Sequence, residues 1–313
     1  RRRAVWQWAL VPVLALLTVT SVGAYLKFGT EVEDRRIELR WNRMPVRYYI
    51  SDGSPVVDPL ALRAATDAAF ATWAGTPRAT LNFEDAGFVK ASPSEQDGMS
   101  TIGFENRPDL DRVLGTTALT IDETTGQIVE ADVLLNAAFA WSTSPGGEIG
   151  RYDVESIVLH EVGHLLGLGH SALGETELRA GGGRRVLGAA SIMFPIAYAP
   201  GSVAARSLHA DDWAGMADIY SSSDYDRDTG SISGTVQKNG RGVFGAHVVA
   251  FNSRTGALVG NFTLDDDGSF AIGGLDPGIY VVRVEPLDDA ETTSYFAETR
   301  EVDVDFKVTY LDR

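Results

Sequence analysis

The chain has 313 residues but no cysteine, and it contains only five histidines. The absence of cysteine excludes disulfide bonds, thiolate zinc sites, a cysteine nucleophile and any inhibitory switch that works through a thiol. Positive charge is also scarce, because 27 lysines and arginines are set against 43 aspartates and glutamates, which gives a net charge of −16. A surface this negative repels phosphate backbones, so we expect no nucleic-acid partner. The overall composition is otherwise that of a globular protein, and the length predicts two domains.

Residues 1–30 hold a long apolar run. Three arginines precede an uncharged stretch from Ala4 to Leu26, which Lys27 ends. The stretch is long enough to cross the roughly 30 Å of hydrocarbon in a bilayer as a helix. Two interpretations stay open: a secretory signal peptide cleaved after Ala24, or an uncleaved membrane anchor with the arginines inside. Both predict an extracellular protein, either secreted or anchored to the outer face of the membrane by this segment.

Residues 31–222 contain both helix and strand signals, as expected for an α/β (α+β) domain. Asp58-Pro59 is a strong helix start, with Asp as the N-cap and Pro in the first turn. Further helices are predicted from Asp153 to Leu166 and over Asp211–Tyr220. Short strands separated by Gly, Pro and Asp clusters are predicted at Arg47–Ile50, Leu81–Phe83, Ser100–Phe104, Ala118–Ile121 and Ile128–Leu135.

Beyond Ser222 the predicted secondary structure changes from mixed α/β to β alone. Residues 223–230 predict a polar hinge, in which Asp224, Asp226 and Asp228 loosely resemble the start of a calcium loop. The remainder of that pattern fails, so Ca²⁺ stays possible but unassigned. Residues 231–313 show short β segments and dense turn signals without a helical stretch, which predicts an all-β antiparallel sandwich.

The segment from Leu159 to Ser171 carries the chemistry. His160 and His164 are four residues apart on a predicted helix, so their rings project from one face and can share a metal. Glu161 is rotated by about 100° from His160 and can lie beside the metal as a general base for a bound water. Gly167 is where the chain must turn sharply, in a left-handed conformation, to bring in His170 as the third ligand. Three imidazoles and one open position predict a single catalytic Zn²⁺.

These residues resemble the extended zinc signature of the metzincin metallopeptidases, and Ser171 after the third histidine resembles the matrixin branch. Ser191-Ile192-Met193-Phe194-Pro195 is similar to the Met-turn, in which Met193 would form an apolar floor beneath the ligands. Ile128–Asn136 resembles the edge strand that pairs with an extended substrate. The resemblance implies a metzincin-like domain with a twisted mixed sheet and an active-site helix. It also places Tyr198 in a possible substrate pocket.

The C-terminal pattern has its own resemblance, to the carboxypeptidase regulatory-like, transthyretin-type sandwich, through Asp266-Asp267-Gly268-Ser269-Phe270 and Gly274-Leu275-Asp276-Pro277-Gly278. This pattern indicates fold and says little about function. The remaining histidines have structural interpretations: His209 as a cap or packing residue, and His247 as a partly exposed residue of the sandwich.

Together these features predict an exported zinc endopeptidase that acts on protein or peptide substrates, with Glu161 as the base and a site complete before Ser222. The alternative is a surface binding or adhesion protein whose metallopeptidase domain is vestigial. An intact Glu161 argues against it, because a dead domain has no need of that carboxylate. A zinc hydrolase of non-peptide amides fits the metal but not the substrate-pairing strand.

Overall fold

The computed structural model describes residues 27–32, 35–180, 182–287, 290, 292–296 and 301–311. The predicted signal or anchor segment lies outside the described residues except for its last few positions. Within the described ranges, no helix is both long and apolar enough to cross a membrane. Lys27 and Phe28 already contact the folded chain, since Lys27 forms an ion pair with Asp218 at 2.7 Å and the Phe28 N–H donates to the Gly167 carbonyl at 2.8 Å.

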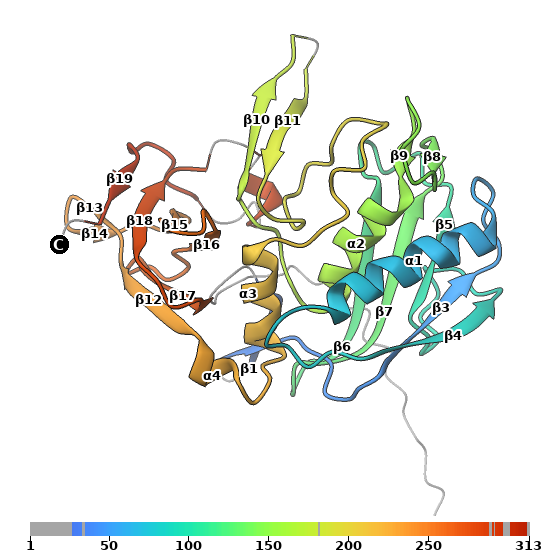
Figure 1. Ribbon diagram of the computed structural model, residues 1–313, viewed down its shortest axis with the longest axis horizontal. Helices are drawn as coiled ribbons and strands as arrows, with labels where there is room; N and C mark the ends of the chain where they lie inside the picture. Colours follow the sequence, from blue (N-terminus) through green and yellow to red (C-terminus); the bar gives the residue numbers. More distant parts are fainter. Residues whose placement is uncertain are drawn as a thin grey trace, which may run out of the picture.

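A five-stranded mixed sheet underlies the N-terminal part of the molecule, residues 27–222 (Figure 1). The strand order is β4-β3-β5-β7-β6, in which β6 is antiparallel to β7 and the other pairs are parallel. This is the twisted mixed sheet that the sequence predicts. Its strands are β3 (Val46–Ser51), β4 (Phe83–Val89), β5 (Thr101–Glu105), β6 (Gly115–Asp122) and β7 (Gln127–Asn136).

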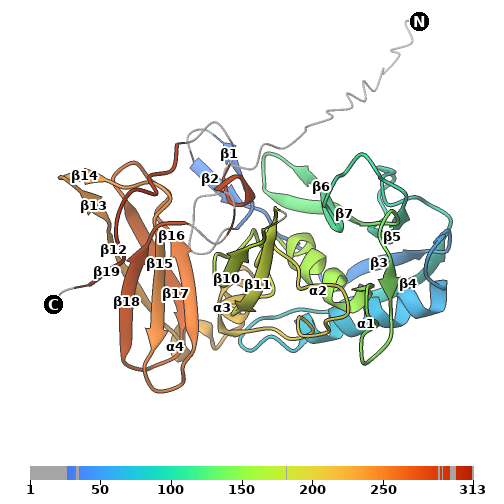
Figure 2. The ribbon, with the colours of Figure 1, turned by 90° about the horizontal axis from the view of Figure 1, so that it is seen from above.

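Two long helices pack together against this sheet (Figure 2). Helix α1 covers Pro59–Ala74 and α2 covers Val154–Leu165. The Asp58 carboxylate accepts hydrogen bonds from two main-chain N–H groups in the first turn of α1, so the predicted helix start is confirmed. The Trp73 indole of α1 donates to the Leu159 carbonyl of α2 at 2.8 Å. Because this bond is buried in the core, it fixes α2 against α1.

The prediction that Ile128–Asn136 forms the edge strand is wrong. This segment belongs to β7, which lies between β5 and β6, and β6 is the edge of the sheet. Seven consecutive residues at the end of β7 are buried, from Glu130 to Asn136. A strand that is buried on both faces shows a continuous run of buried residues, as β7 does. Along β6, by contrast, more exposed and less exposed residues alternate over most of the strand. The burial pattern of β6 is therefore that of an edge strand, and the burial pattern of β7 is that of an internal strand.

A projecting hairpin was not predicted. Strands β10 (Gly174–Leu178) and β11 (Arg184–Ala189) form an antiparallel pair that stands away from the body in Figure 1. Four of their eleven residues are charged and one is buried, so the segment lacks the apolar alternation that identifies strands. Smaller strand pairs are β1 (Gly29–Val32) with β2 (Arg35–Glu38) and β8 (Trp141–Ser142) with β9 (Tyr152–Asp153).

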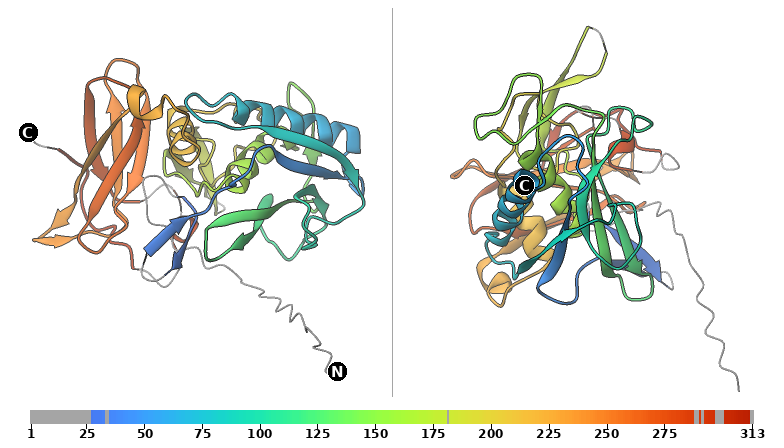
Figure 3. Two further views of the ribbon diagram at one scale, coloured as in Figure 1. Left: turned by 90° about the horizontal axis from the view of Figure 1, so that it is seen from below. Right: turned by 90° about the vertical axis from the view of Figure 1, so that its right-hand side faces the viewer.

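The C-terminal part comprises residues 223–311, and from Gly230 onward its described strands form an antiparallel β unit, as predicted (Figure 3). It contains a four-stranded sheet of order β16-β15-β18-β19, the pair β12-β17 and the hairpin β13-β14. The strands are β12 (Gly230–Thr235), β13 (Gln237–Lys238), β14 (Arg241–Gly242), β15 (His247–Asn252), β16 (Leu258–Phe262), β17 (Ser269–Leu275), β18 (Tyr280–Glu285) and β19 (Thr309–Tyr310). A 3₁₀ turn, η1, covers Thr292–Ser294.

The two parts share a packed boundary. Helix α3 (Ala210–Ile219) lies between the two parts and contacts β16 and β17 (Figure 1). Its Ala214 belongs to the apolar core of the C-terminal part. The predicted hinge holds one turn of helix, α4 (Tyr225–Asp228), and the Tyr225 hydroxyl donates to Asp218 of α3 at 2.8 Å. The C-terminal part is therefore docked against α3 along this boundary.

Candidate metal centre and cleft

Helix α2 carries the first two histidines, and its start is fixed by Asp153. The Asp153 carboxylate accepts hydrogen bonds from the main-chain N–H and the hydroxyl of Ser156, at 3.0 and 2.6 Å. The Arg206 guanidinium closes a two-bonded ion pair on the same carboxylate, at 2.5 and 2.9 Å. His160 and His164 follow on one face of the helix. Their ring centroids are 4.7 Å apart.

The turn after α2 delivers His170. Gly167 adopts φ +102°, as predicted, and a Cβ at this position would lie 2.5 Å from the Leu39 carbonyl oxygen. Only glycine fits both the left-handed conformation and this close approach. The chain then turns back, so that the His170 ring reaches the other two rings at centroid distances of 5.4 and 4.8 Å.

The three rings are oriented alike by main-chain carbonyls. Nδ1 of His160 contacts the Ile192 carbonyl at 2.7 Å, Nδ1 of His164 that of Leu168 at 2.8 Å, and Nδ1 of His170 that of Ser294 at 2.6 Å. A carbonyl oxygen can only accept, so each Nδ1 carries the proton and each Nε2 keeps its lone pair. Burial lowers the pKa of all three imidazoles, that of His170 to about 4, and so favours the neutral form that binds metals.

The three Nε2 atoms fit a metal ion. Potential ligand atoms of the three histidines lie within 4.8 Å of one another, and this is the one such group of His, Asp or Glu within the described ranges. Nε2 of His164 and Nε2 of His170 face each other at 3.2 Å. Neither nitrogen has a proton to donate, so the two lone pairs repel unless a cation lies between them. Three neutral imidazoles are the donor set of catalytic zinc sites.

Glu161 lies beside this group, buried against strand β6. Its side chain has 4% of its surface exposed, and the Thr117 hydroxyl donates to Oε2 at 2.7 Å. Burial raises the pKa of the carboxyl to about 7. The strand passes so close that a Cβ on Gly115 would lie 2.8 Å from Oε1. The edge strand therefore sets the position of both carboxylate oxygens.

Met193 packs against α2 at Gly163. Its sulfur would lie 2.3 Å from a Cβ on Gly163, so the helix can approach only because that residue is glycine. Asp212 shapes this turn, a role that the sequence did not reveal. Its buried carboxylate accepts from the Ser191 hydroxyl at 2.5 Å and from the Ile192 N–H at 3.0 Å. It thereby positions the carbonyl that orients His160.

A cleft of about 1460 Å³ opens at the three histidines. One side is the start of β6, Gly115–Thr117, and another is the hairpin β10-β11. Tyr198 lines the cleft, and its hydroxyl accepts a hydrogen bond from the Ala189 N–H at 3.0 Å. The substrate-pocket role of Tyr198 stays a prediction, as do the roles of the three histidines, Glu161 and Met193. Residues of the C-terminal part also line the cleft, namely Thr293, Ser294, Tyr295 and Phe296.

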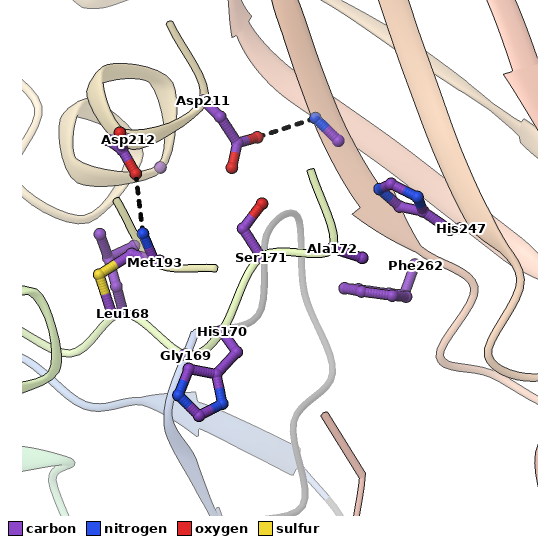
Figure 4. Close-up of a pocket in the computed structure, with 12 residues that line it drawn as sticks. Leu168, Gly169, His170, Ser171, Ala172, Met193, Asp211, Asp212, His247 and Phe262 are labelled. Carbon is purple, nitrogen blue, oxygen red and sulfur yellow. Dashed lines mark hydrogen bonds between the residues drawn. The ribbon is translucent and has the colours of Figure 1, made fainter. Parts of the chain in front are cut away.

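The C-terminal part also contacts the site's surroundings at Asp211, near Ser171. The Asp211 carboxylate accepts the Gly260 N–H of β16 at 2.8 Å (Figure 4). His247 lines the same small cavity and is 2% exposed, with Nδ1 3.0 Å from the Glu285 carboxylate. The prediction that His247 is partly exposed is wrong, because it lies on the central strand β15, between β16 and β18, and its ring stacks on Phe262 at 5.3 Å. His209 is the N-cap of α3, in line with its predicted structural role.

The calcium interpretation finds no support. The Asp224–Asp228 segment forms the helical turn α4, and Arg227 makes ion pairs with Asp224 and Asp228 at 3.0 and 2.8 Å. Across the described parts of the chain, no group of acidic residues is arranged to hold a metal.

Known proteins match both parts of the chain. The family model for matrixin matches residues 40–179, and that for the carboxypeptidase regulatory-like domain matches residues 231–309. A metalloendoproteinase of Arabidopsis thaliana, 2-MMP, is 31% identical over 154 residues, which make up 44% of this chain and 36% of the relative. The matched region thus spans little more than a third of that relative. The chain carries a matrixin domain of metzincin-like fold, and a carboxypeptidase regulatory-like domain follows it.

Proposed function

We propose that this protein is an exported zinc metalloendopeptidase. The observation that carries the proposal is the convergence of three Nε2 lone pairs beside the buried carboxylate of Glu161, in an open cleft. The matrixin domain and the metalloendoproteinase relative support the metallopeptidase class. Export rests on the apolar stretch from Ala4 to Leu26, as a cleaved signal or an outer-face anchor.

The proposed mechanism assigns metal binding to the histidines and proton transfer to Glu161. His160, His164 and His170 would hold zinc, which when bound supplies Lewis-acid polarisation of a water and of the scissile carbonyl. Glu161 accepts the proton of the attacking water and then donates it to the leaving amine. Thr117 occupies Oε2 of this carboxylate, so Oε1 is the oxygen left to carry the proton.

The edge strand is suited to an extended peptide. Among the strands that the structure describes, β6 pairs with β7 alone, and its first residues line the cleft next to Glu161. The unpaired main-chain groups of such an edge recognise a peptide by adding it as a further strand. This favours a protein or peptide substrate over a small amide.

An adhesion protein with a vestigial metallopeptidase domain is the alternative. It accounts for the β-rich C-terminal part but gives no reason for a carboxylate held between β6 and the metal site. A vestigial domain and a peptidase differ in one measurable property, which is chelator-sensitive cleavage.

The test uses purified protein, a casein mixture and a zinc chelator. We expect one zinc per chain, cleavage of casein, loss of cleavage with the chelator and recovery on adding zinc back. A folded protein that binds no zinc would overturn the proposal. Zinc binding without cleavage of any protein substrate would favour the adhesion alternative.

A further inference from the structure

A short segment of the C-terminal part reaches the metal centre. In the segment Thr292–Phe296, the last four residues line the cleft, and the Ser294 carbonyl lies 2.6 Å from Nδ1 of His170. His160 and His164 find their carbonyl partners within the matrixin-like part, at Ile192 and Leu168. His170 instead finds its partner 124 residues along the chain, within the C-terminal part.

The segment is held in place by its own aromatic residues. Tyr295 and Phe296 are each 7% exposed and belong to a small apolar core with Phe262 of β16. Their rings lie 5.5 and 5.3 Å from the Phe262 ring. Ala172 and Ile196 of the N-terminal part pack against the same core. The anchor of the segment is therefore built from both parts of the molecule.

The main chain of the segment presents the Ser294 carbonyl to the site. The N–H groups of Tyr295 and Phe296 both donate to the Thr292 carbonyl, at 3.0 and 2.9 Å. This closes a tight turn around Ser294. The turn and the two anchored rings together fix where the Ser294 oxygen lies.

The boundary behind the segment is fixed as well. The Asp211 carboxylate bonds to the Gly260 N–H at 2.8 Å, and Ala214 is buried in the sandwich core. Arg78 forms an ion pair with Asp276 at 2.7 Å. These contacts hold the C-terminal part against the N-terminal part without any contribution from Thr292–Phe296.

We propose that the C-terminal domain is part of the metal centre: the Ser294 carbonyl is the positioning partner that holds His170 as an Nε2 ligand. A ligating histidine needs a partner on its other nitrogen to fix the tautomer and the ring orientation, and loss of such partners costs about 10–100-fold in metal affinity. The proposal rests on the proposed zinc site. It makes the sandwich a structural requirement for tight zinc binding.

The test compares full-length variants by their zinc dissociation constants, measured by competition with a chromogenic chelator. Phe296→Ala removes an anchor of the segment and is expected to weaken zinc binding about 10–100-fold. Phe296→Leu keeps apolar bulk and is expected to restore most of the affinity. Ser294→Ala leaves the carbonyl in place and is expected to bind zinc like wild type. If Phe296→Ala does not fold, Tyr295→Ala takes its place.

Two further measurements separate positioning from general destabilisation. Ile272→Ala removes a fully buried side chain from the other core of the sandwich and should leave zinc affinity unchanged despite a lower melting temperature. In zinc-loaded wild type, nitrogen NMR should show three slowly exchanging imidazole Nδ1–H protons, and Phe296→Ala should lose that of His170.

The outcomes distinguish this inference from the proposed function. Wild-type protein that binds no zinc refutes the zinc site itself. Tight zinc binding by wild type together with unchanged affinity and an unchanged His170 Nδ1–H in folded Phe296→Ala refutes only the role of the segment. Equal zinc loss in Phe296→Ala and Ile272→Ala would also overturn it, because the effect would then follow stability alone.

Discussion

Helix α2 carries two predicted ligands and, one residue after the first, the predicted base. Glu161→Gln keeps the size and hydrogen-bonding capacity of the side chain but cannot accept a proton. We expect it to fold, to bind zinc like wild type and to lose peptidase activity by a factor on the order of 10²–10⁴. His160→Ala should instead lose zinc. Cleavage by Glu161→Gln at close to the wild-type rate would show that another group is the base.

Gly115 controls the same carboxylate from the edge strand. A Cβ there would lie 2.8 Å from Oε1 and 3.1 Å from Cδ of Glu161, so Gly115→Ala must displace the side chain. We expect zinc content to be unchanged and kcat/KM to fall on the order of 10- to 100-fold, because small misplacements of a reacting group are costly. Gly146→Ala is the matched control, since no atom lies within 4 Å of its added Cβ. Equal activity in both variants would contradict this role.

At the scale of elements, the start of α2 depends on one carboxylate. Asp153 caps the helix and pairs with Arg206, and it is 5% exposed. Asp153→Ala should lower the free energy of unfolding by about 2 kcal/mol or more, since it removes a cap and one of the two carboxylates that pair with the partly buried Arg206. Asp58→Ala, at the exposed cap of α1, should cost only about 1 kcal/mol. Urea denaturation measures both, and equal losses would mean that the Arg206 pair contributes nothing.

Local signals made these helices predictable. The Asp58-Pro59 cap, the Asp153 cap and the glycine turn at Gly167 depend on neighbouring residues, and all three are observed. The spacing of the three histidines likewise predicted that they would come together. Strand order in the sheet has no such local signal, because pairing joins residues far apart in the chain. That is why the sequence prediction places the edge strand at Ile128–Asn136, in β7, whereas the structure has it at β6.

The partners of the site residues were the least predictable feature. Asp212 carries no pattern that links it to the Ile192 turn, and the Ser294 contact with His170 is made by a main-chain oxygen. A carbonyl is present at every residue, so no residue type marks the one that is used. The burial of His247 is missed for a related reason, since it follows from strand order, which places β15 between β16 and β18.

At the scale of the whole molecule, the boundary between the two parts contains a buried carboxyl group. Asp211 is 5% exposed and bonds to the Gly260 N–H across the boundary. Burial, followed by the nearby Asp212 charge, raises its pKa to about 7, and hydrogen bonds from Gly260, Ser171 and Ser191 lower it in part. An ionised Asp211 therefore makes the docked arrangement less stable.

The sign of the resulting pH dependence follows from linkage. An unfolded aspartate has a pKa of about 3.9, so between about pH 4 and pH 7 the folded protein binds more protons than the unfolded chain at this position. The contribution of Asp211 to the free energy of unfolding is thus most favourable at about pH 4 and falls as the pH rises to about 7.

Asp211→Asn keeps an oxygen for the Gly260 N–H and does not ionise. We expect it to match wild type near pH 4.5 and to be more stable than wild type near pH 8, when both are denatured in urea at a fixed zinc concentration. Parallel stability curves for the two proteins across this range would show that Asp211 does not carry the dependence. A variant that is less stable at every pH would instead mean that the amide cannot replace the carboxyl group in its bonds to Ser171 and Ser191.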